Sequence, residues 1–218
     1  MSARETLRVV VIDDHPLLRK GLQQLADLSP DIEIVGEVDD GAAGLIMVQK
    51  LKPDLVLLDL NMPGMNGQET LIALKQMDLD TRVVILTVSN AEEDIVAALR
   101  GGADGYLLKD MDPELLLDNF REVANGRLVM SPNIAECLIR ALRTDKRGMG
   151  VTNISELTKR ECEILVHISG GESNKVIARK LDIAEATVKV HVKHLLKKLG
   201  LKSRVEAAVW AVNQKVTL

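Results

Sequence analysis

Over the first 126 residues, five short apolar runs alternate with amphipathic segments, and this alternation restricts the fold more than any other feature of the sequence. The runs are rich in Val, Ile and Leu with few polar residues between them, which is typical of strands buried on both faces of a parallel sheet. They lie at residues 9–12, 32–35, 55–58, 83–86 and 106–108. Because amphipathic segments separate the runs, we predict an α/β domain with a five-stranded, doubly wound parallel sheet.

The segments between the apolar runs have the features of helices. Segments 66–77 and 91–100 each carry an apolar face at helical spacing. Before the last helix of this region, Asp112 can act as the N-cap and Pro113 suits the first helical position, while Gly126 can end the helix. We therefore expect the first domain to end at residue 126.

A weakly patterned stretch follows at residues 127–153. It contains a possible short helix at 133–143 and then a mixed-charge segment with two glycines and little apolar content. Such a composition favours an extended connection rather than a packed element. We predict an interdomain linker over 127–153 and a second domain over 154–218.

The second domain has only helical patterns. Thr158 and Glu161 have the spacing of a capping box, and Ser173 can cap a second helix. Further helices are expected over about 185–198 and 203–214. A short helix followed through a tight turn by a basic helix is the layout of a helix-turn-helix, so we predict a small all-α helix-turn-helix domain.

Charge is divided unequally between the two predicted domains. Residues 151–218 hold 12 of the 28 Lys and Arg but 7 of the 32 Asp and Glu, which gives +5 there and −9 over residues 1–150. A basic second domain indicates contacts with nucleic acid phosphates. The scarcity of aromatic residues, 1% of the chain, argues against a stacking platform for single strands.

Several sequence features bear on the location of the protein. No apolar run reaches the roughly 18 residues of a membrane span, and no signal peptide is recognisable. The two cysteines, Cys137 and Cys162, lack metal-ligand spacing and are expected to be reduced thiols. We expect a cytoplasmic protein without a membrane partner.

Charged and polar residues follow the predicted strands at the points where the strands end. They are Asp13, Asp14, Asp59, Thr87 and Lys109. Because the carboxyl ends of parallel strands lie at one edge of the sheet, these side chains are expected to share a crevice. Clustered carboxylates repel one another, and a hard divalent ion such as Mg²⁺ would relieve the repulsion.

The same residues predict phosphoryl chemistry. Asp59 can act as a carboxylate nucleophile, Lys109 can neutralise phosphoryl oxygens, and Thr87 can donate a hydrogen bond to the new phosphate. A single Asp after a strand is more often a helix cap or a solvated turn residue, but the joint occurrence at four strand ends favours a site. We interpret His15, beside the Asp pair, as a loop residue rather than a metal ligand.

The predicted helix at 185–198 carries a basic face. Lys189, Lys193 and Lys197 recur every four residues, which places them on one side. A solvated basic face is the plainer interpretation, but the position in a helix-turn-helix favours DNA contact. In a major groove, Lys189, Val190 and Lys193 would face base edges and phosphates. Additional phosphate contacts are expected from Lys175, Arg179, Lys197, Lys198, Lys202 and Arg204.

The first domain resembles the receiver domain of two-component response regulators. The segments VVVIDDHP, LVLLDLNMPGMNG, VVILTVS and GADGYLLKD carry the resemblance, which covers about residues 7–126. It implies that Asp59 is the phosphoacceptor and that Thr87 and Tyr106 form a switch pair. It also implies a set of Mg²⁺ ligands: Asp14, Asp59, the backbone carbonyl of Asn61 and, through water, Asp13. One departure is Asp110, where many receivers have proline after the lysine.

The second domain resembles the LuxR/FixJ family of DNA-binding domains over about residues 157–209. The segments LTKRECEILVHISGGESNKVIARKLDIAEATVKVHVKHLLKKLG and LKSRVEAAV carry this resemblance. Val176 and Ala184 depart from it, and Ala184 cannot accept the capping hydrogen bond of a Ser or Thr, a loss of roughly 0.5–2 kcal/mol. The last helix resembles the family's dimerisation surface, although ordinary core packing explains its apolar residues equally well. Those residues are Val205, Ala208, Val209 and Val212.

Together these resemblances imply a transcriptional regulator activated by phosphorylation of Asp59. The implied partners are a sensor histidine kinase, double-stranded promoter DNA, a second copy of the chain on DNA and, as a possible contact, RNA polymerase. The whole chain resembles the nitrate- and nitrite-responsive members, and this resemblance also implies an unphosphorylated state with a covered recognition helix. We expect a protein that accepts a phosphoryl group, and can lose it by autodephosphorylation, rather than an enzyme.

Two alternatives remain open at this point. An aspartyl-phosphate phosphatase would use the same pocket, but position 61 is Asn where such enzymes place a second carboxylate. A DNA-binding protein whose first domain is a non-phosphorylated scaffold would need none of the clustered residues. Turnover of phosphate monoesters would favour the first alternative, and absence of phosphate incorporation would favour the second.

Overall fold

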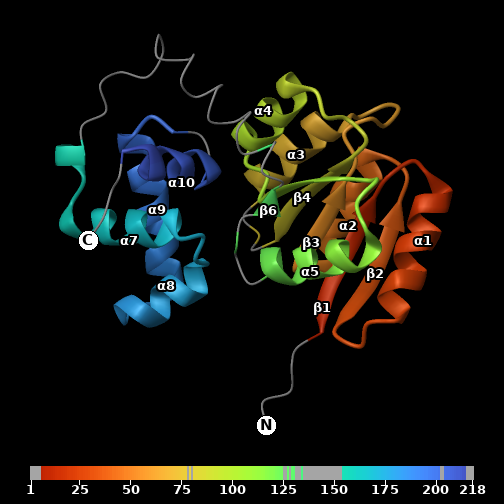
Figure 1. Cartoon of the computed structure of the whole chain (residues 1–218), viewed down its shortest axis with the longest axis horizontal. Coiled ribbons are helices and arrows are strands. Elements are labelled where there is room, and N and C mark those ends of the chain that lie inside the picture. The colour runs from red at the N-terminus through yellow and green to blue at the C-terminus, as the bar shows by residue number, and fades with distance from the viewer. Residues whose placement is uncertain are drawn as a thin grey trace.

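The computed structural model describes residues 6–77, 79, 81–124, 127, 129–130, 134, 154–201 and 204–214. The N-terminal domain alternates strands and helices, and the C-terminal domain is helical (Figure 1). The strands of the first domain are β1 (Leu7–Ile12), β2 (Ile32–Val38), β3 (Leu55–Leu58), β4 (Arg82–Thr87), β5 (Gly105–Leu108) and β6 (Val129–Met130). Its helices are α1 (Pro16–Asp27), α2 (Gly41–Leu51), α3 (Gly67–Gln76), α4 (Glu92–Arg100) and α5 (Pro113–Ala124).

All strand pairs are parallel, and the sheet order is β2-β1-β3-β4-β5-β6. The five predicted strands and the doubly wound topology are confirmed. The short strand β6 was not predicted, because its two residues lie in the stretch assigned to the linker. It pairs Val129 with Gly105 and Met130 with Tyr106, which gives β5 a hydrogen-bonded neighbour on its outer side. Most of the predicted linker, with its possible helix at 133–143, lies outside the described residues, so the domain boundaries stay predictions.

Both faces of the sheet are buried, as the continuous apolar runs predict. In β1, Val9 and Val11 pack in one core layer with residues of α1 and α5. Val10 and Ile12 point to the other layer, which is formed with α2, α3 and α4. All four of these side chains are essentially inaccessible to solvent. Alternating side chains therefore fill two separate cores, which is why the strand sequences lack a polar face.

The C-terminal domain contains η2 (Ile154–Glu156), α7 (Lys159–Ser169), α8 (Asn174–Leu181), α9 (Glu185–Lys198) and α10 (Arg204–Asn213). The capping box of Thr158 and Glu161 and the cap at Ser173 form as predicted. Asp182 adopts a left-handed conformation with φ 51° and turns the chain from α8 into α9. Ala184 caps α9 without a side-chain hydrogen bond, so packing of Val188 and Leu195 in the helical core holds this helix in place.

The two domains touch through α4 and α10 (Figure 1). Val205 of α10 is buried in the same core cluster as residues of α4, and Val209 packs against that cluster. Arg100 Nε at the end of α4 lies 3.5 Å from a carboxylate oxygen of Glu206, which is itself buried. Among the described residues, no helix is long and apolar enough to span a membrane.

Candidate phosphoacceptor pocket and DNA-contacting helix

Backbone hydrogen bonds of the sheet place the predicted pocket residues at one edge. Asp13 N donates to Val38 O, Asp59 N donates to Ile12 O, and Lys109 N donates to Thr87 O. These bonds continue the parallel ladders of β1, β3 and β5 just past their carboxyl ends. The side chains that follow the strands therefore converge on one crevice.

Lys109 connects two buried carboxylates in this crevice. Its Nζ lies 2.8 Å from Asp59 Oδ2 and 2.8 Å from Asp13 Oδ2. Asp59 is 1% exposed and Asp13 is 2% exposed, and the lysine side chain is itself 9% exposed. Low exposure strengthens these charge-assisted hydrogen bonds and fixes the position of Asp59.

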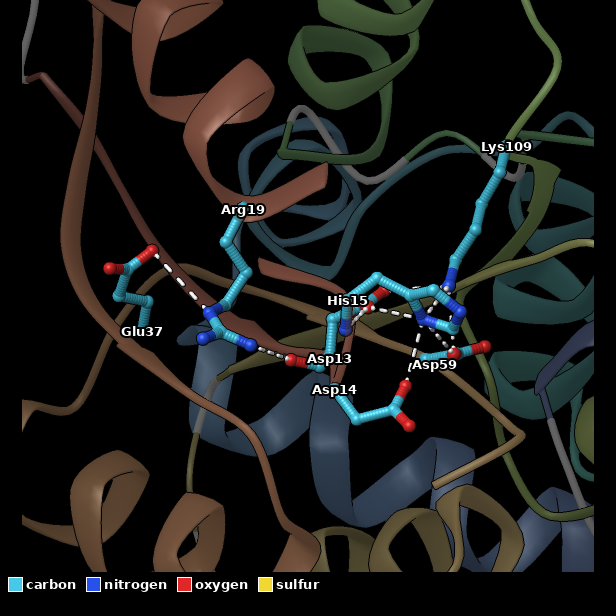
Figure 2. A network of polar contacts seen from close by, with 7 residues as sticks. All are labelled: Asp13, Asp14, His15, Arg19, Glu37, Asp59 and Lys109. Carbon is cyan, nitrogen blue, oxygen red and sulfur yellow. Dashed lines mark hydrogen bonds and ion pairs between the residues drawn. The ribbon is translucent and has the colours of Figure 1, made fainter. Parts of the chain in front are cut away.

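His15 lies at the mouth of the same crevice, where Figure 2 shows its ring between the carboxylates and Lys109. Its Nδ1 is 2.8 Å from Asp14 Oδ1 and 3.1 Å from Asp13 Oδ1. The side chain is 59% exposed. His15 is the N-cap residue of α1, and its ring contacts the carboxylates of the cluster. The prediction that His15 is not a metal ligand stays a prediction.

Glycine at position 67 allows the close approach of α3 to the crevice. A Cβ atom at position 67 would lie 2.0 Å from the backbone oxygen of Asp59, so any residue other than glycine would clash with the backbone there. Gly67 N in turn donates to Leu60 O at 3.0 Å. The loop after β3 is thereby held against the first turn of α3, which restricts where the Asp59 carboxylate can lie.

The donor set fits a hard divalent cation. Asp13, Asp14, His15 and Asp59 each offer a ligand atom within 4.8 Å of the others. Asp59 Oδ1 is buried and accepts no hydrogen bond in the described part of the chain. A buried carboxylate oxygen without a partner is costly, and Mg²⁺ prefers carboxylate oxygens. Asn61, whose carbonyl was predicted as a further ligand, follows in an exposed loop, and its role stays a prediction.

The predicted switch residues connect this edge to α4. Thr87 is fully buried at the end of β4, and Tyr106 is fully buried on β5. Ser89 lies between them: Ser89 N donates to Thr87 Oγ1 at 3.3 Å, and the Tyr106 hydroxyl donates to Ser89 O at 2.9 Å. Ser89 Oγ also donates to Asp94 in the first turn of α4 at 2.5 Å. A change at Thr87 can thus reach α4 through one residue.

The predicted DNA-contacting side chains are accessible on the surface of the helical domain. Those exposed on α9 are Lys189, Val190, Lys193 and Lys197, and those exposed on α8 are Lys175 and Arg179. His194 is also exposed, four residues after Val190, and helical periodicity would have placed it on this face.

Two of the additional phosphate contacts expected from the sequence have partners inside the domain. Lys198 Nζ lies 2.7 Å from Glu161, and Arg204 donates to Asn174 Oδ1 at 2.7 Å and to the Glu172 carbonyl. Lys202 lies outside the described residues. Lys198 and Arg204 therefore make polar contacts within the helical domain in this arrangement.

In this arrangement α9 faces the first domain across a groove of about 690 Å³. Lys189 and Lys193 line one wall, and residues at the amino ends of β4 and β5 line the other. The predicted dimerisation face of α10 is also partly covered, because Val205 is buried against the first domain while Val212 is 61% exposed. Neither surface is fully available while the two domains are closed on each other.

A second charged cluster lies at the amino ends of β4 and β5. Asp104 accepts from Lys75 Nζ at 2.5 Å, from Arg82 at 3.1 Å and from Val83 N at 2.9 Å. Burial raises the pKa of Asp104, but Lys75 and Arg82 outweigh this effect and lower it to about 2. This carboxylate is fully paired, in contrast to Asp59.

A doubly wound domain with a carboxylate crevice, joined to a helix-turn-helix domain, defines a class of two-domain proteins with an acidic site on one domain and a DNA-binding fold on the other. The chain belongs to the response regulator family. Its residues 9–121 match the response regulator receiver domain, and residues 155–211 match the bacterial regulatory proteins of the luxR family. Both matched families are described as regulatory.

Individual relatives cover the whole chain. It is 52% identical to the nitrate/nitrite response regulator protein NarL of Escherichia coli K12 over 99% of this chain and 100% of the relative. It is 44% identical to the nitrate/nitrite response regulator protein NarP of the same organism, over 99% of both chains. The crystal structure of the response regulator ChrA, from a heme-sensing two-component system, is similar with a TM-score of 0.53 and 38% identity. That likeness covers 97% of this chain and 99% of ChrA.

Proposed function

We propose that this protein is a transcription factor whose binding to promoter DNA is controlled by phosphorylation of Asp59. The observation that carries the proposal is the state of the Asp59 carboxylate, which is buried and positioned by Lys109, and whose Oδ1 accepts no hydrogen bond from any described residue. A buried carboxylate with a free oxygen beside an ammonium group is suited to attack phosphorus. A sensor histidine kinase is the proposed phosphoryl donor.

In the proposed transfer, an Asp59 oxygen forms a bond to phosphorus while the bond from phosphorus to the donor's imidazole nitrogen breaks. The released imidazole takes up a proton from solvent. Lys109 stays within reach of the phosphoryl oxygens and compensates their charge. Mg²⁺ held by Asp14, Asp59 and the Asn61 carbonyl, with Asp13 acting through water, would supply further positive charge.

The new phosphate adds about one to two negative charges at the end of β3. Thr87, on the neighbouring strand, would turn its hydroxyl toward the phosphate and give up its contact with Ser89 N. Tyr106 and Asp94 share Ser89, so the first turn of α4 would shift with it. Because α4 carries Arg100, the contact with Glu206 on α10 would weaken.

Separation of the domains would expose both functional surfaces of the helical domain. The lysines of α9 could then enter a DNA major groove, and α10 could pair with α10 of a second copy on DNA. RNA polymerase is a further candidate partner on promoter DNA. The names of the 52% and 44% identical relatives support genes of nitrate- and nitrite-responsive respiration as targets.

The test compares promoter binding of the wild-type chain and Asp59→Asn, with and without a small-molecule phosphodonor and Mg²⁺. We expect stimulated binding for the wild type only, since Asn cannot form the acyl phosphate. Lys189→Ala and Lys193→Ala should each weaken binding and reduce its dependence on salt. Equal stimulation of Asp59→Asn would contradict the proposed phosphorylation site, and undiminished binding by both lysine variants would contradict the choice of reading helix.

A further inference from the structure

Arg19 lies on α1, close to the two acidic residues that follow β1 (Figure 2). One nitrogen of its guanidinium group donates a hydrogen bond of 2.5 Å to the backbone oxygen of Asp13. Its Nε lies 3.8 Å from a carboxylate oxygen of Glu37 on β2. The Arg19 side chain is 17% exposed and Glu37 is 50% exposed, so the hydrogen bond to the Asp13 carbonyl is the better shielded of the two contacts.

The carbonyl that Arg19 contacts belongs to the peptide group between Asp13 and Asp14. The peptide group on the other side of Asp13 is also held, because Asp13 N donates to Val38 O at 3.0 Å. Since peptide groups are planar, hydrogen bonds to both groups that flank Asp13 restrict its φ and ψ angles. The direction in which the chain enters Asp14 is therefore set by β2 and by one side chain of α1.

The side chains of Asp13 and Asp14 are restrained to different degrees. Asp13 Oδ1 accepts from His15 N at 2.8 Å, and Asp13 Oδ2 lies 2.8 Å from Lys109 Nζ. The Asp14 carboxylate is 30% exposed and lies 2.8 Å from Nδ1 of His15, whose side chain is 59% exposed. An exposed ring restrains its neighbour weakly, so the position of the Asp14 carboxylate depends mainly on the backbone that leads to it.

Mg²⁺ binding is sensitive to such a restraint. The ion requires near-octahedral geometry with oxygen ligands at about 2.0–2.1 Å, so rotation of the peptide between Asp13 and Asp14 would carry Asp14 out of range. Arg19 could instead act through its charge alone, by offsetting the repulsion among the carboxylates. That role predicts the opposite effect on Mg²⁺ affinity, because a nearby cation disfavours the binding of another cation.

We propose that Arg19 is a positioning residue of the carboxylate crevice: its guanidinium group holds the peptide between Asp13 and Asp14 and so places the Asp14 carboxylate where it can bind Mg²⁺. This role rests on the proposed function, because it assigns Arg19 to the proposed metal site. Arg19 touches neither the ion nor the phosphoryl group and acts only through the backbone of the acidic pair. Its removal should therefore impair the use of Mg²⁺ and leave Asp59 intact as the phosphoacceptor.

The first test is calorimetric titration of the unphosphorylated full chain with Mg²⁺. Arg19→Met removes the donor and should bind Mg²⁺ about tenfold more weakly than wild type, as is typical when a hydrogen-bond partner behind a metal ligand is lost. Arg19→Lys keeps a donor and the charge and should recover most of the affinity. Lys20→Met, which removes an exposed cation from the same helix, should bind like wild type.

A thermal melt of each variant verifies that the chain is folded. If Arg19→Met is unfolded, Arg19→Gln takes its place, because the shorter polar side chain removes the guanidinium group without adding an apolar one.

The rate of phosphate incorporation supplies the second measurement, made by intact mass with a small-molecule phosphodonor over a range of Mg²⁺ concentrations. Below the wild-type dissociation constant for Mg²⁺, Arg19→Met should incorporate phosphate several-fold more slowly than wild type. At saturating Mg²⁺ the two rates should converge, because Asp59 and Lys109 are unchanged. A deficit that saturating Mg²⁺ removes distinguishes displaced ligands from damage to the nucleophile.

Mg²⁺ binding by folded Arg19→Met that equals or exceeds that of wild type would overturn the proposal, since the guanidinium group would then act through its charge or not at all. A deficit in incorporation that persists unchanged at saturating Mg²⁺ would also overturn it. In both cases incorporation by the wild type would leave the proposed function standing. Absence of incorporation by the wild type would overturn the proposed function, and the role of Arg19 with it.

Discussion

An Asp–Lys ion pair lies at each end of the sheet, but the two pairs differ in the charges that surround them. At the carboxyl ends, Asp59 lies 2.8 Å from Lys109, and at the amino ends, Asp104 lies 2.5 Å from Lys75. Among the described residues, carboxylates outnumber cations around Asp59 and one buried Asp59 oxygen accepts no hydrogen bond, whereas cations outnumber the carboxylate around Asp104. The surplus charge, rather than the pair itself, distinguishes a reactive site from a stabilising one. The acidic end would attract a cation.

The largest predicted difference between the two ends is chemical. Asp59→Asn should abolish phosphoryl incorporation from a small-molecule phosphodonor, because the amide is not a nucleophile for this reaction. Asp104→Asn should incorporate phosphate like wild type, provided that it is folded. Intact-mass measurement of both variants reports the phosphate incorporated. Incorporation into Asp59→Asn to the wild-type extent would show that Asp59 is not the phosphoacceptor.

The next difference is in stability, at the paired end of the sheet. The pKa of Asp104 is lowered to about 2, against about 3.9 for an unfolded Asp, so the charged form stabilises the fold by roughly 2 kcal/mol above pH 4. That contribution is lost as the pH falls from about 4 to about 2. We expect Asp104→Asn to lower the free energy of unfolding at pH 7 by about this amount.

Urea titrations at pH 7 and at decreasing pH would measure this contribution. The gap between wild type and Asp104→Asn should close in the acid range. A gap that is absent at pH 7, or that is independent of pH down to 2, would contradict a paired Asp104. Lys50→Gln serves as the control for loss of a single exposed charge.

Addition of Mg²⁺ should affect the stability of the Asp59 and Asp104 variants differently. If the carboxylate crevice binds Mg²⁺ only when folded, a tenfold excess over its dissociation constant stabilises the wild type by about 1.4 kcal/mol. Asp104→Asn should gain the same increment, and Asp59→Asn should gain less because a ligand is removed. Thermal melts with Mg²⁺ or with matched ionic strength measure this, and an equal gain for Asp59→Asn would place the ion elsewhere.

The smallest expected effect is on the free energy of unfolding of Asp59→Asn, and it has the opposite sign to the effect of Asp104→Asn. Without Mg²⁺, Asp59→Asn should raise the free energy of unfolding by up to about 1 kcal/mol, because it relieves repulsion among Asp13, Asp14 and Asp59. Asp104→Asn destabilises, so the two substitutions of the same type should act in opposite directions. Destabilisation by Asp59→Asn in urea titrations would show that the bond to Lys109 outweighs the repulsion.

The carboxyl end could be predicted from the sequence, and the amino end could not. Asp59 and Lys109 directly follow apolar runs, and the parallel topology brings all such positions to one edge. Asp104 gains its role from Lys75 and Arg82, which lie 29 and 22 residues away in helix and strand positions without a shared local pattern.

The contact between the two domains could not be predicted from the sequence for a related reason. The apolar residues of α10 suit core packing, dimerisation and contact with the first domain equally well, and only the folded chain places Val205 against the core of that domain. The pairing of Arg100 with Glu206 depends on how two separately folded units dock. Likewise, the short strand β6 depends on the free edge of β5 rather than on its own two residues.

In the proposed activation, a phosphate on Asp59 separates the two domains. Spin labels at Gln49→Cys on α2 and Lys180→Cys on α8, in a chain with Cys137 and Cys162 replaced by serine, would report the distance between the domains. With phosphodonor and Mg²⁺, the distance distribution should shift to longer values and broaden, and the same chain carrying Asp59→Asn should keep the closed distance. An unchanged distribution in a chain shown by mass to be phosphorylated would mean that the phosphate does not separate the domains.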